Sequence, residues 1–294
     1  MKIDHLVRAV TPNIRAFAAI TTSIVEVARI RHDLFPVAAA ALGRTMTGAL
    51  LLAANLKNNE RVTLRILGDG PLGEVIADAR NDGTVRGYVG MPHVVLPPKN
   101  GKLDVGGAVG KGWLAVTRFT GLKEPFTGTC ALVSGEIAED LAHYLLVSEQ
   151  VPSLVALGVK VGRDLSVIAA GGLIVQAMPG ADEAALVRIE ERLSTIPSVT
   201  QMVEEGLDAK GLIDMVVPEE GVVYGSPTSL SFRCQCSRER VMSMLAGLGK
   251  EELAEMAAEG KAEVRCHFCG ETYRFTPAEL EEIPGCLNNK NGKD

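Results

Sequence analysis

Four cysteines near the C-terminal end constrain this chain more than any other feature of its sequence. They form two close pairs, Cys234-x-Cys236 and Cys266-x-x-Cys269, separated by residues 237–265. Four thiolates arranged in this way match the closed tetrahedral ligand set of a zinc site. Gly270 follows the second pair and allows the tight turn of a metal knuckle. The sequence therefore predicts a small zinc-binding module with all four cysteines as ligands.

The chemistry of this module leaves two interpretations open. A module of roughly 55 residues has little core, so metal binding would supply on the order of 10–16 kcal/mol of its folding free energy. The cysteines within each pair are also close enough to form a local disulfide, and oxidation would then expel the metal and remove the main stabiliser. The site is either a permanent zinc staple or a switch that responds to oxidant.

Composition and pattern divide the 294 residues into four segments. Residues 1–180 combine helical and strand-like patterns, which predicts an N-terminal mixed α/β core domain and an α+β fold class. Residues 181–230 are expected to form a metastable, mostly helical acidic linker. Residues 231–287 are the predicted four-cysteine zinc domain, and residues 288–294 are expected to be a loose tail.

In the first segment, the spacing of apolar residues predicts two helices, followed along the chain by several strands. A helix is expected over residues 13–28 and a mostly buried one over residues 36–55. Further on, alternation and turn residues predict strands at 61–67, 74–78, 85–89, 114–119 and 128–133, a helix at 137–149 and a strand at 167–176.

The excess negative charge lies in the linker. The whole chain has a net charge of −6, and residues 182–220 alone carry −7, from three basic and ten acidic residues. Asp182 is placed to cap a helix that carries Ile189 on its apolar face. Many glycines and prolines interrupt the segment after that helix, which favours low local stability. An ordinary acidic linker is the alternative interpretation.

Several classes of protein are disfavoured. The negative net charge argues against nucleic-acid binding through bulk positive charge. We expect a cytoplasmic protein that does not bind membranes, because neither a signal peptide nor an apolar run of about 18 residues is visible. Gly68-x-Gly70-x-x-Gly73 formally matches a dinucleotide fingerprint, but a strand-like pattern follows it, so nucleotide binding is not expected. A thiol oxidoreductase would place C-x-x-C at a helix start, whereas a knuckle hairpin is predicted here.

The cysteine pattern resembles that of the 33-kilodalton redox-regulated heat-shock chaperone family of bacteria. Motifs in the same order along nearly the whole chain support the resemblance: Gly68-Asp-Gly-Pro-Leu-Gly73, Val85-Arg-Gly-Tyr88, Gly110-Lys-Gly112, Val133-Ser-Gly-Glu-Ile-Ala-Glu-Asp140 and Ser148-Glu-Gln-Val-Pro-Ser153.

The resemblance implies a holdase, a chaperone and not an enzyme, which keeps unfolding client proteins from aggregating without nucleotide. In the reduced state, one Zn²⁺ ion bound by the four cysteines would keep the protein inactive and monomeric. On oxidation, Cys234 would pair with Cys236 and Cys266 with Cys269, zinc would leave, the linker would unfold and the active form would dimerise. The alternative is a constitutive zinc-ribbon protein with a structural zinc site that binds nucleic acid or protein.

Two cysteines lie outside the quartet. Cys130 falls in an apolar strand-like segment and is expected to be an inert buried thiol. Cys286, after Pro284-Gly285, is either a bystander or a site of mixed disulfides.

Overall fold

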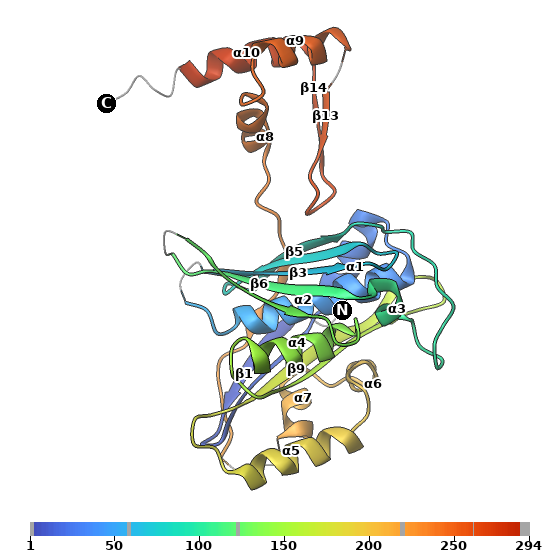
Figure 1. Cartoon of the computed structure of the whole chain (residues 1–294), viewed down its shortest axis with the longest axis vertical. Coiled ribbons are helices and arrows are strands. Elements are labelled where there is room, and N and C mark those ends of the chain that lie inside the picture. Colours follow the sequence, from blue (N-terminus) through green and yellow to red (C-terminus); the bar gives the residue numbers. More distant parts are fainter. Residues whose placement is uncertain (1–2, 58–59, 122–123, 218–220, 261, 289–294) are drawn as a thin grey trace. The chain divides into compact units, whose positions relative to one another are not determined.

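The structure is a computed structural model that describes residues 3–57, 60–121, 124–217, 221–260 and 262–288. The chain divides into two compact units, Met1–Arg233 and Cys234–Asp294. The first unit contains two large sheets with helices between and beside them, and the second contains the paired cysteines (Figure 1). The predicted α+β class with a C-terminal four-cysteine module is confirmed.

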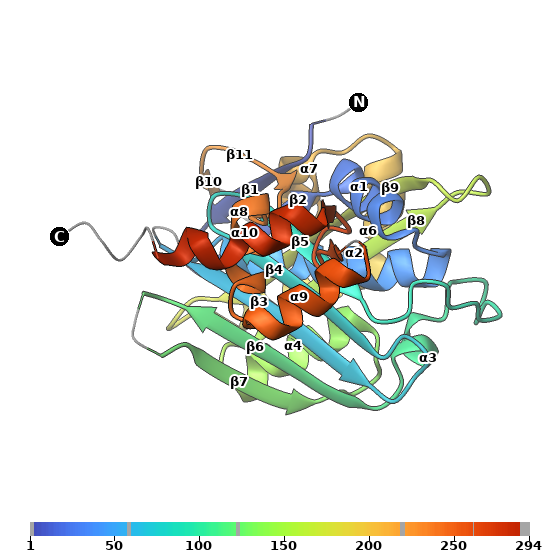
Figure 2. The same ribbon diagram turned by 90° about the horizontal axis from the view of Figure 1, so that it is seen from above.

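Two six-stranded sheets form the framework of the first unit. The first has the order β10 (Val223–Tyr224), β1 (His5–Val10), β2 (Ile14–Ile20), β9 (Val167–Ala177) and β8 (Ser153–Val161), with β11 (Thr228–Ser229) also paired to β1. The second has the order β12 (Ser231–Phe232), β5 (Thr84–Val89), β4 (Glu74–Arg80), β3 (Arg61–Gly68), β6 (Gly112–Phe119) and β7 (Phe126–Ala131). Strands β5, β4, β3, β6 and β7 of the second sheet lie side by side in Figure 2. Only β12 runs parallel to its neighbour in that sheet.

Helix α2 (Pro36–Ala53) is the central element of the first unit. It contacts β3, β4 and β5 of one sheet and β2, β8 and β9 of the other. Every residue of the helix except Pro36 and Arg44 is buried, as its Ala- and Leu-rich sequence predicts. Its 18 residues have the length and mean hydropathy of a membrane span, but 89% of them are buried inside the protein. The length and the hydropathy of α2 are therefore explained by its position in the core of the first unit.

Shorter helices of this unit include α1 (Thr22–His32), α3 (Val105–Val109) and α4 (Ile137–Val147). The start of α1 is capped from a distance, because the buried carboxylate of Asp4 accepts the N–H groups of Ser23 and Ile24. The cap joins α1 to the strand segment at the beginning of the chain.

The helix predicted over residues 13–28 is wrong in its first half. Residues Ile14–Ile20 form β2, and the helix begins only at Thr22. Strand β2 pairs with β1 and β9 and has six of its seven residues buried. A strand buried on both faces lacks polar alternation, so its apolar spacing could be mistaken for that of a helix.

The segment predicted as a linker lies within the first unit and packs against its first sheet. It forms α5 (Glu183–Thr195), α6 (Val199–Glu204) and α7 (Ala209–Val216), followed by β10 and β11, which pair with β1. Asp182 caps α5 as predicted, by accepting the N–H of Ala184. Buried residues of these helices, together with Val217 after α7, share one apolar cluster with β1, β2 and β9: Ile189, Val199, Met202, Val203, Ala209, Leu212, Ile213 and Val216. Residues 218–220 of this segment lie outside the described part of the chain.

The second unit contains helices and a hairpin whose ends are marked by capping residues close to them in the sequence. It contains α8 (Arg238–Leu245), α9 (Lys250–Ala258), the hairpin of β13 (Ala262–Arg265) and β14 (Thr272–Phe275), and α10 (Pro277–Asn288). Ser237 caps α8, and Thr276 and Glu279 form a capping box at the start of α10. A small core holds the elements together, with Phe275 and Leu280 among its most buried members. The last residues of the predicted tail, 289–294, lie outside the described residues.

Candidate metal centre

The four paired cysteines come from two loops of the second unit. Cys234 and Cys236 lie in the extended segment before α8, and Cys266 and Cys269 lie in the turn between β13 and β14. This turn is closed by two backbone hydrogen bonds of 2.8 Å, from Cys266 N to the carbonyl of Glu271 and from Gly270 N to that of Cys266. Gly270 has a φ of +72°, the left-handed conformation for which the knuckle requires glycine.

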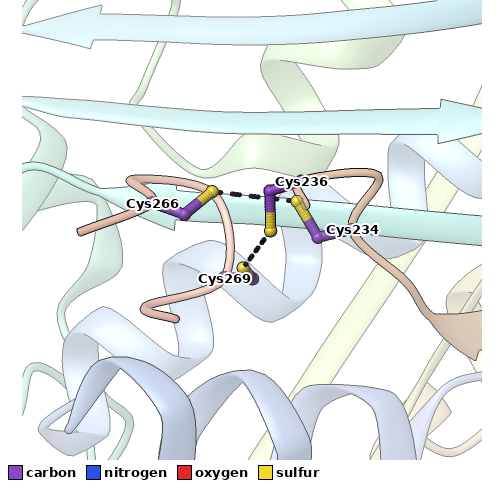
Figure 3. Close-up of side chains that lie close together, drawn as sticks. All are labelled: Cys234, Cys236, Cys266 and Cys269. Carbon is purple, nitrogen blue, oxygen red and sulfur yellow. Dashed lines mark hydrogen bonds between the residues drawn. The ribbon is translucent and has the colours of Figure 1, made fainter. Parts of the chain in front are cut away.

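The structure brings all four sulfur atoms into one cluster. Each Sγ lies within 4.8 Å of the others. Across the two loops, Cys234 Sγ is 3.8 Å from Cys266 Sγ, and Cys236 Sγ is 3.3 Å from Cys269 Sγ (Figure 3). These four ligand atoms can hold one metal ion, and a set of four sulfurs suits zinc in tetrahedral coordination. Within the described residues this cluster consists of the cysteines alone and does not include His267.

Burial and hydrogen bonds from main-chain N–H groups shift the pKa values of the two hairpin cysteines in opposite directions. Burial raises the pKa of the Cys266 thiol, while N–H groups of Phe268 and Cys269 that point at its sulfur oppose the rise. Burial also raises the pKa of Cys269, whose sulfur accepts the N–H of Glu271. Without metal these thiols are therefore held protonated, and a metal ion must displace their protons when it binds.

A tyrosine that the sequence analysis did not identify contacts the cluster. The Tyr273 hydroxyl donates a hydrogen bond of 3.2 Å to Cys236 Sγ. This hydrogen bond raises the pKa of Tyr273. Alternation along β14 is the signal that points to this residue, because Tyr273 and the buried Phe275 are two positions apart and share one face of the strand.

Two arginines support the loops. Arg238 makes a 2.6 Å ion pair with Glu279, and its guanidinium lies 4.3 Å from the centre of the Phe275 ring. Arg240 donates to the carbonyl of Gln235, the residue between the first two cysteines. Arg238 thus connects α8 to β14 and α10, and Arg240 connects α8 to the segment that carries Cys234 and Cys236.

Comparisons with known proteins agree with this architecture. The sequence profile of the family described as Hsp33 protein matches residues 4–276. The chain belongs to the Hsp33 family. It is 51% identical to the 33 kDa chaperonin of Desulforamulus reducens, over 98% of this chain and 99% of that relative. It is 50% identical to the 33 kDa chaperonin of Symbiobacterium thermophilum, with the same coverage.

A solved structure of the Hsp33 family has the same fold. The crystal structure of the 33 kDa chaperonin from Thermotoga maritima matches with a TM-score of 0.90 at 39% identity, and covers 97% of this chain and 99% of that one. The predicted resemblance is confirmed, and the chain is a member of a chaperone family.

Among the described residues, the four-sulfur cluster of this Hsp33 chain does not include Cys130. Cys130 lies in β7 with 7% of its surface exposed, and burial raises the pKa of its thiol. Cys130 is therefore buried, as predicted, and a buried protonated thiol reacts slowly. Cys286 falls within α10, but its side chain lies outside the described residues.

Proposed function

We propose that this chain is a redox-regulated, ATP-independent holdase that binds unfolding proteins in the cytoplasm and is not an enzyme. In the reduced state Cys234, Cys236, Cys266 and Cys269 would bind one Zn²⁺ ion, and the protein would be an inactive monomer. In the oxidised state the disulfides Cys234–Cys236 and Cys266–Cys269 would replace the metal, and the active protein would dimerise. The clustering of four sulfurs from two loops is the observation that carries this proposal.

Zinc would act on the fold of the module. When bound, the ion supplies the cross-link that holds two deprotonated pairs together. A complete set of four protein ligands leaves no position for substrate, which supports a structural or regulatory role over hydrolysis. The small core of the second unit makes its folding strongly dependent on that cross-link.

Peroxide can oxidise each pair in two balanced steps. One thiolate attacks the peroxide, so that an S–O bond forms, the O–O bond breaks and hydroxide leaves. The second thiol of the pair then attacks this sulfur, forming the S–S bond and releasing the oxygen as water. Each pair thereby loses two electrons to one peroxide molecule and also loses its ability to bind zinc.

The segment of α5, α6 and α7 would transmit the change. Only Arg233 separates β12 from Cys234, and β12 attaches to β5 through two residues, so unfolding of the module would act first on β12, which follows α7 and the short strands β10 and β11 in the chain. Apolar packing, rather than ion pairing, holds the segment on the sheet. Its ion pair Lys160–Glu204 has side chains that are 46% and 41% exposed, and such pairs contribute little stability.

Release of these helices would uncover an apolar surface. Their buried residues pack on the sheet residues Val7, Ala9, Ile14, Ala16, Ala18, Ile20, Ala169, Leu173 and Val175. A contiguous apolar face of this kind is what a holdase needs in order to bind exposed hydrophobic segments of a client.

The test follows zinc, thiols and chaperone activity together. The reduced, zinc-loaded full chain is treated with hydrogen peroxide or hypochlorous acid while a dye records zinc release, and aggregation of a heat-unfolded client is monitored. We expect one zinc ion to leave per chain, four thiols to disappear, aggregation to be suppressed and the chain to dimerise. Cys130→Ser, outside the cluster, is the matched control and should behave as the wild type.

Two results would contradict the proposal. Zinc that stays bound under oxidant, or equal protection by the reduced and oxidised forms, would favour a constitutive zinc module instead. A Cys234→Ser variant that still loses zinc and is activated normally would remove the role assigned to the first pair.

A further inference from the structure

The hydrogen bond from Tyr273 to Cys236 joins the two halves of the metal module. Tyr273 belongs to the β13–β14 hairpin, where it is paired with Val264, whereas Cys236 lies in the segment before α8. The hydroxyl oxygen is 3.2 Å from Cys236 Sγ, within the range of a hydrogen bond to sulfur. A side chain from one half therefore contacts a metal-ligating atom of the other.

The hairpin fixes the position of this hydroxyl. Phe275, two positions along β14, is 2% exposed in the core of the module, and Thr276 begins the capping box directly after it. The backbone register from Ala262–Phe275 to Arg265–Thr272 holds the strand in place. The Tyr273 ring itself packs against the apolar core of the module.

The donor to Cys236 differs in kind from the donors to the hairpin sulfurs. Beyond their contacts with the other sulfurs, Cys266 Sγ accepts N–H groups of Phe268 and Cys269, and Cys269 Sγ accepts that of Glu271, so these further donors belong to the main chain. The bond to Cys236 comes from a side chain. Loss of one oxygen atom would remove it and leave the fold of the knuckle intact.

The geometry points to Tyr273 as a positioning residue that protects Cys236 and sets how readily the centre responds to oxidant. A hydrogen bond occupies a lone pair of the sulfur and lowers its nucleophilicity, because the electrons that would attack an electrophile are partly drawn toward the donor. Groups that bond to metal ligands also orient them, and their loss typically weakens metal binding by about 10- to 100-fold. This inference rests on the proposed redox function.

The variant Tyr273→Phe tests the inference in the full, zinc-loaded chain, because it removes the hydroxyl and keeps the ring. Tyr88→Phe is the matched control, since the Tyr88 hydroxyl also donates a hydrogen bond, to Glu74 of the first unit. Iodoacetamide is added without oxidant, and mass spectrometry gives the alkylation rates of Cys234 and Cys236. The ratio of the two rates is an internal reference within each molecule.

We expect Tyr273→Phe to raise the ratio of Cys236 to Cys234 alkylation about tenfold and to weaken zinc binding at least about tenfold against a competing chelator. Peroxide-driven zinc release should accelerate as well. An unchanged alkylation ratio, or an equal rise in Tyr88→Phe, would overturn the inference. Alkylation needs no oxidant, so this result is independent of the redox proposal, which fails instead if the wild-type chain keeps its zinc under peroxide.

Discussion

Truncation of one leucine in the linker should open it without oxidant. Leu212 lies in α7, is fully buried, and belongs to the apolar cluster shared with β1 and β2. Replacement of a buried leucine by alanine costs about 2–5 kcal/mol in lost transfer free energy and cavity formation. If this free energy is lost only from the closed state of α7, Leu212→Ala raises the equilibrium constant for local opening of α7 by roughly 30-fold to several thousand-fold.

Hydrogen exchange and chaperone activity measure this effect in the reduced, zinc-loaded protein. We expect faster amide exchange in residues 199–217 and partial suppression of client aggregation, with zinc content unchanged. Leu64→Ala is the matched control, because Leu64 is equally buried but lies in the core cluster around α2. It should lower the global free energy of unfolding without selective exchange in residues 199–217.

Two outcomes would refute this reasoning. If exchange in residues 199–217 is the same in Leu212→Ala and Leu64→Ala, the linker is not an independently opening segment. If the linker opens in Leu212→Ala and the reduced protein still does not protect a client, the surface beneath the helices is not the surface that binds clients.

Further predictions concern a buried carboxylate and the metal. Asp140 is fully buried and accepts the N–H groups of Val133 and Ser134 with Oδ1, and burial raises its pKa. A raised folded-state pKa contributes stability that is complete below the unfolded pKa of about 3.9 and is lost as pH rises through the folded pKa. Asp140→Asn, which does not ionise, should therefore gain stability relative to the wild type as pH rises from 4 to 7 in urea unfolding, and a difference independent of pH would contradict this. Removal of zinc by a chelator should abolish the protection of backbone amides from hydrogen exchange in the β13–β14 hairpin, while amides of the first unit stay protected. A hairpin that stays protected would show that the apolar core of the second unit is enough to keep it folded without metal.

Local signals in the sequence predicted the second unit well. The predicted C-x-x-C-Gly knuckle is found where its pattern places it. The Ser237 cap and the Thr276–Glu279 capping box likewise depend on residues only three positions apart. Four cysteines in two close pairs were enough to predict the cluster, because few other arrangements satisfy four thiols in one small module.

Long-range pairing was less accessible from the sequence. Strand β2 was expected to be helical because both of its faces are buried, and β1 and β8 were not predicted. The pairing of β12 with β5 joins residues about 150 positions apart, and its two-residue strand has no pattern of its own. Tyr273 was missed because its contact with Cys236 depends on the packing of two loops rather than on sequence spacing.

Amide hydrogen exchange in α5, α6 and α7 during a peroxide titration tests the central claim most directly, with zinc release recorded in the same samples. The account predicts that protection of these helices is lost in proportion to zinc release, while β3 and α2 in the core of the first unit stay protected. Complete zinc release with unchanged protection of α5, α6 and α7 would contradict it, because the metal centre would then not control the segment that covers the apolar sheet.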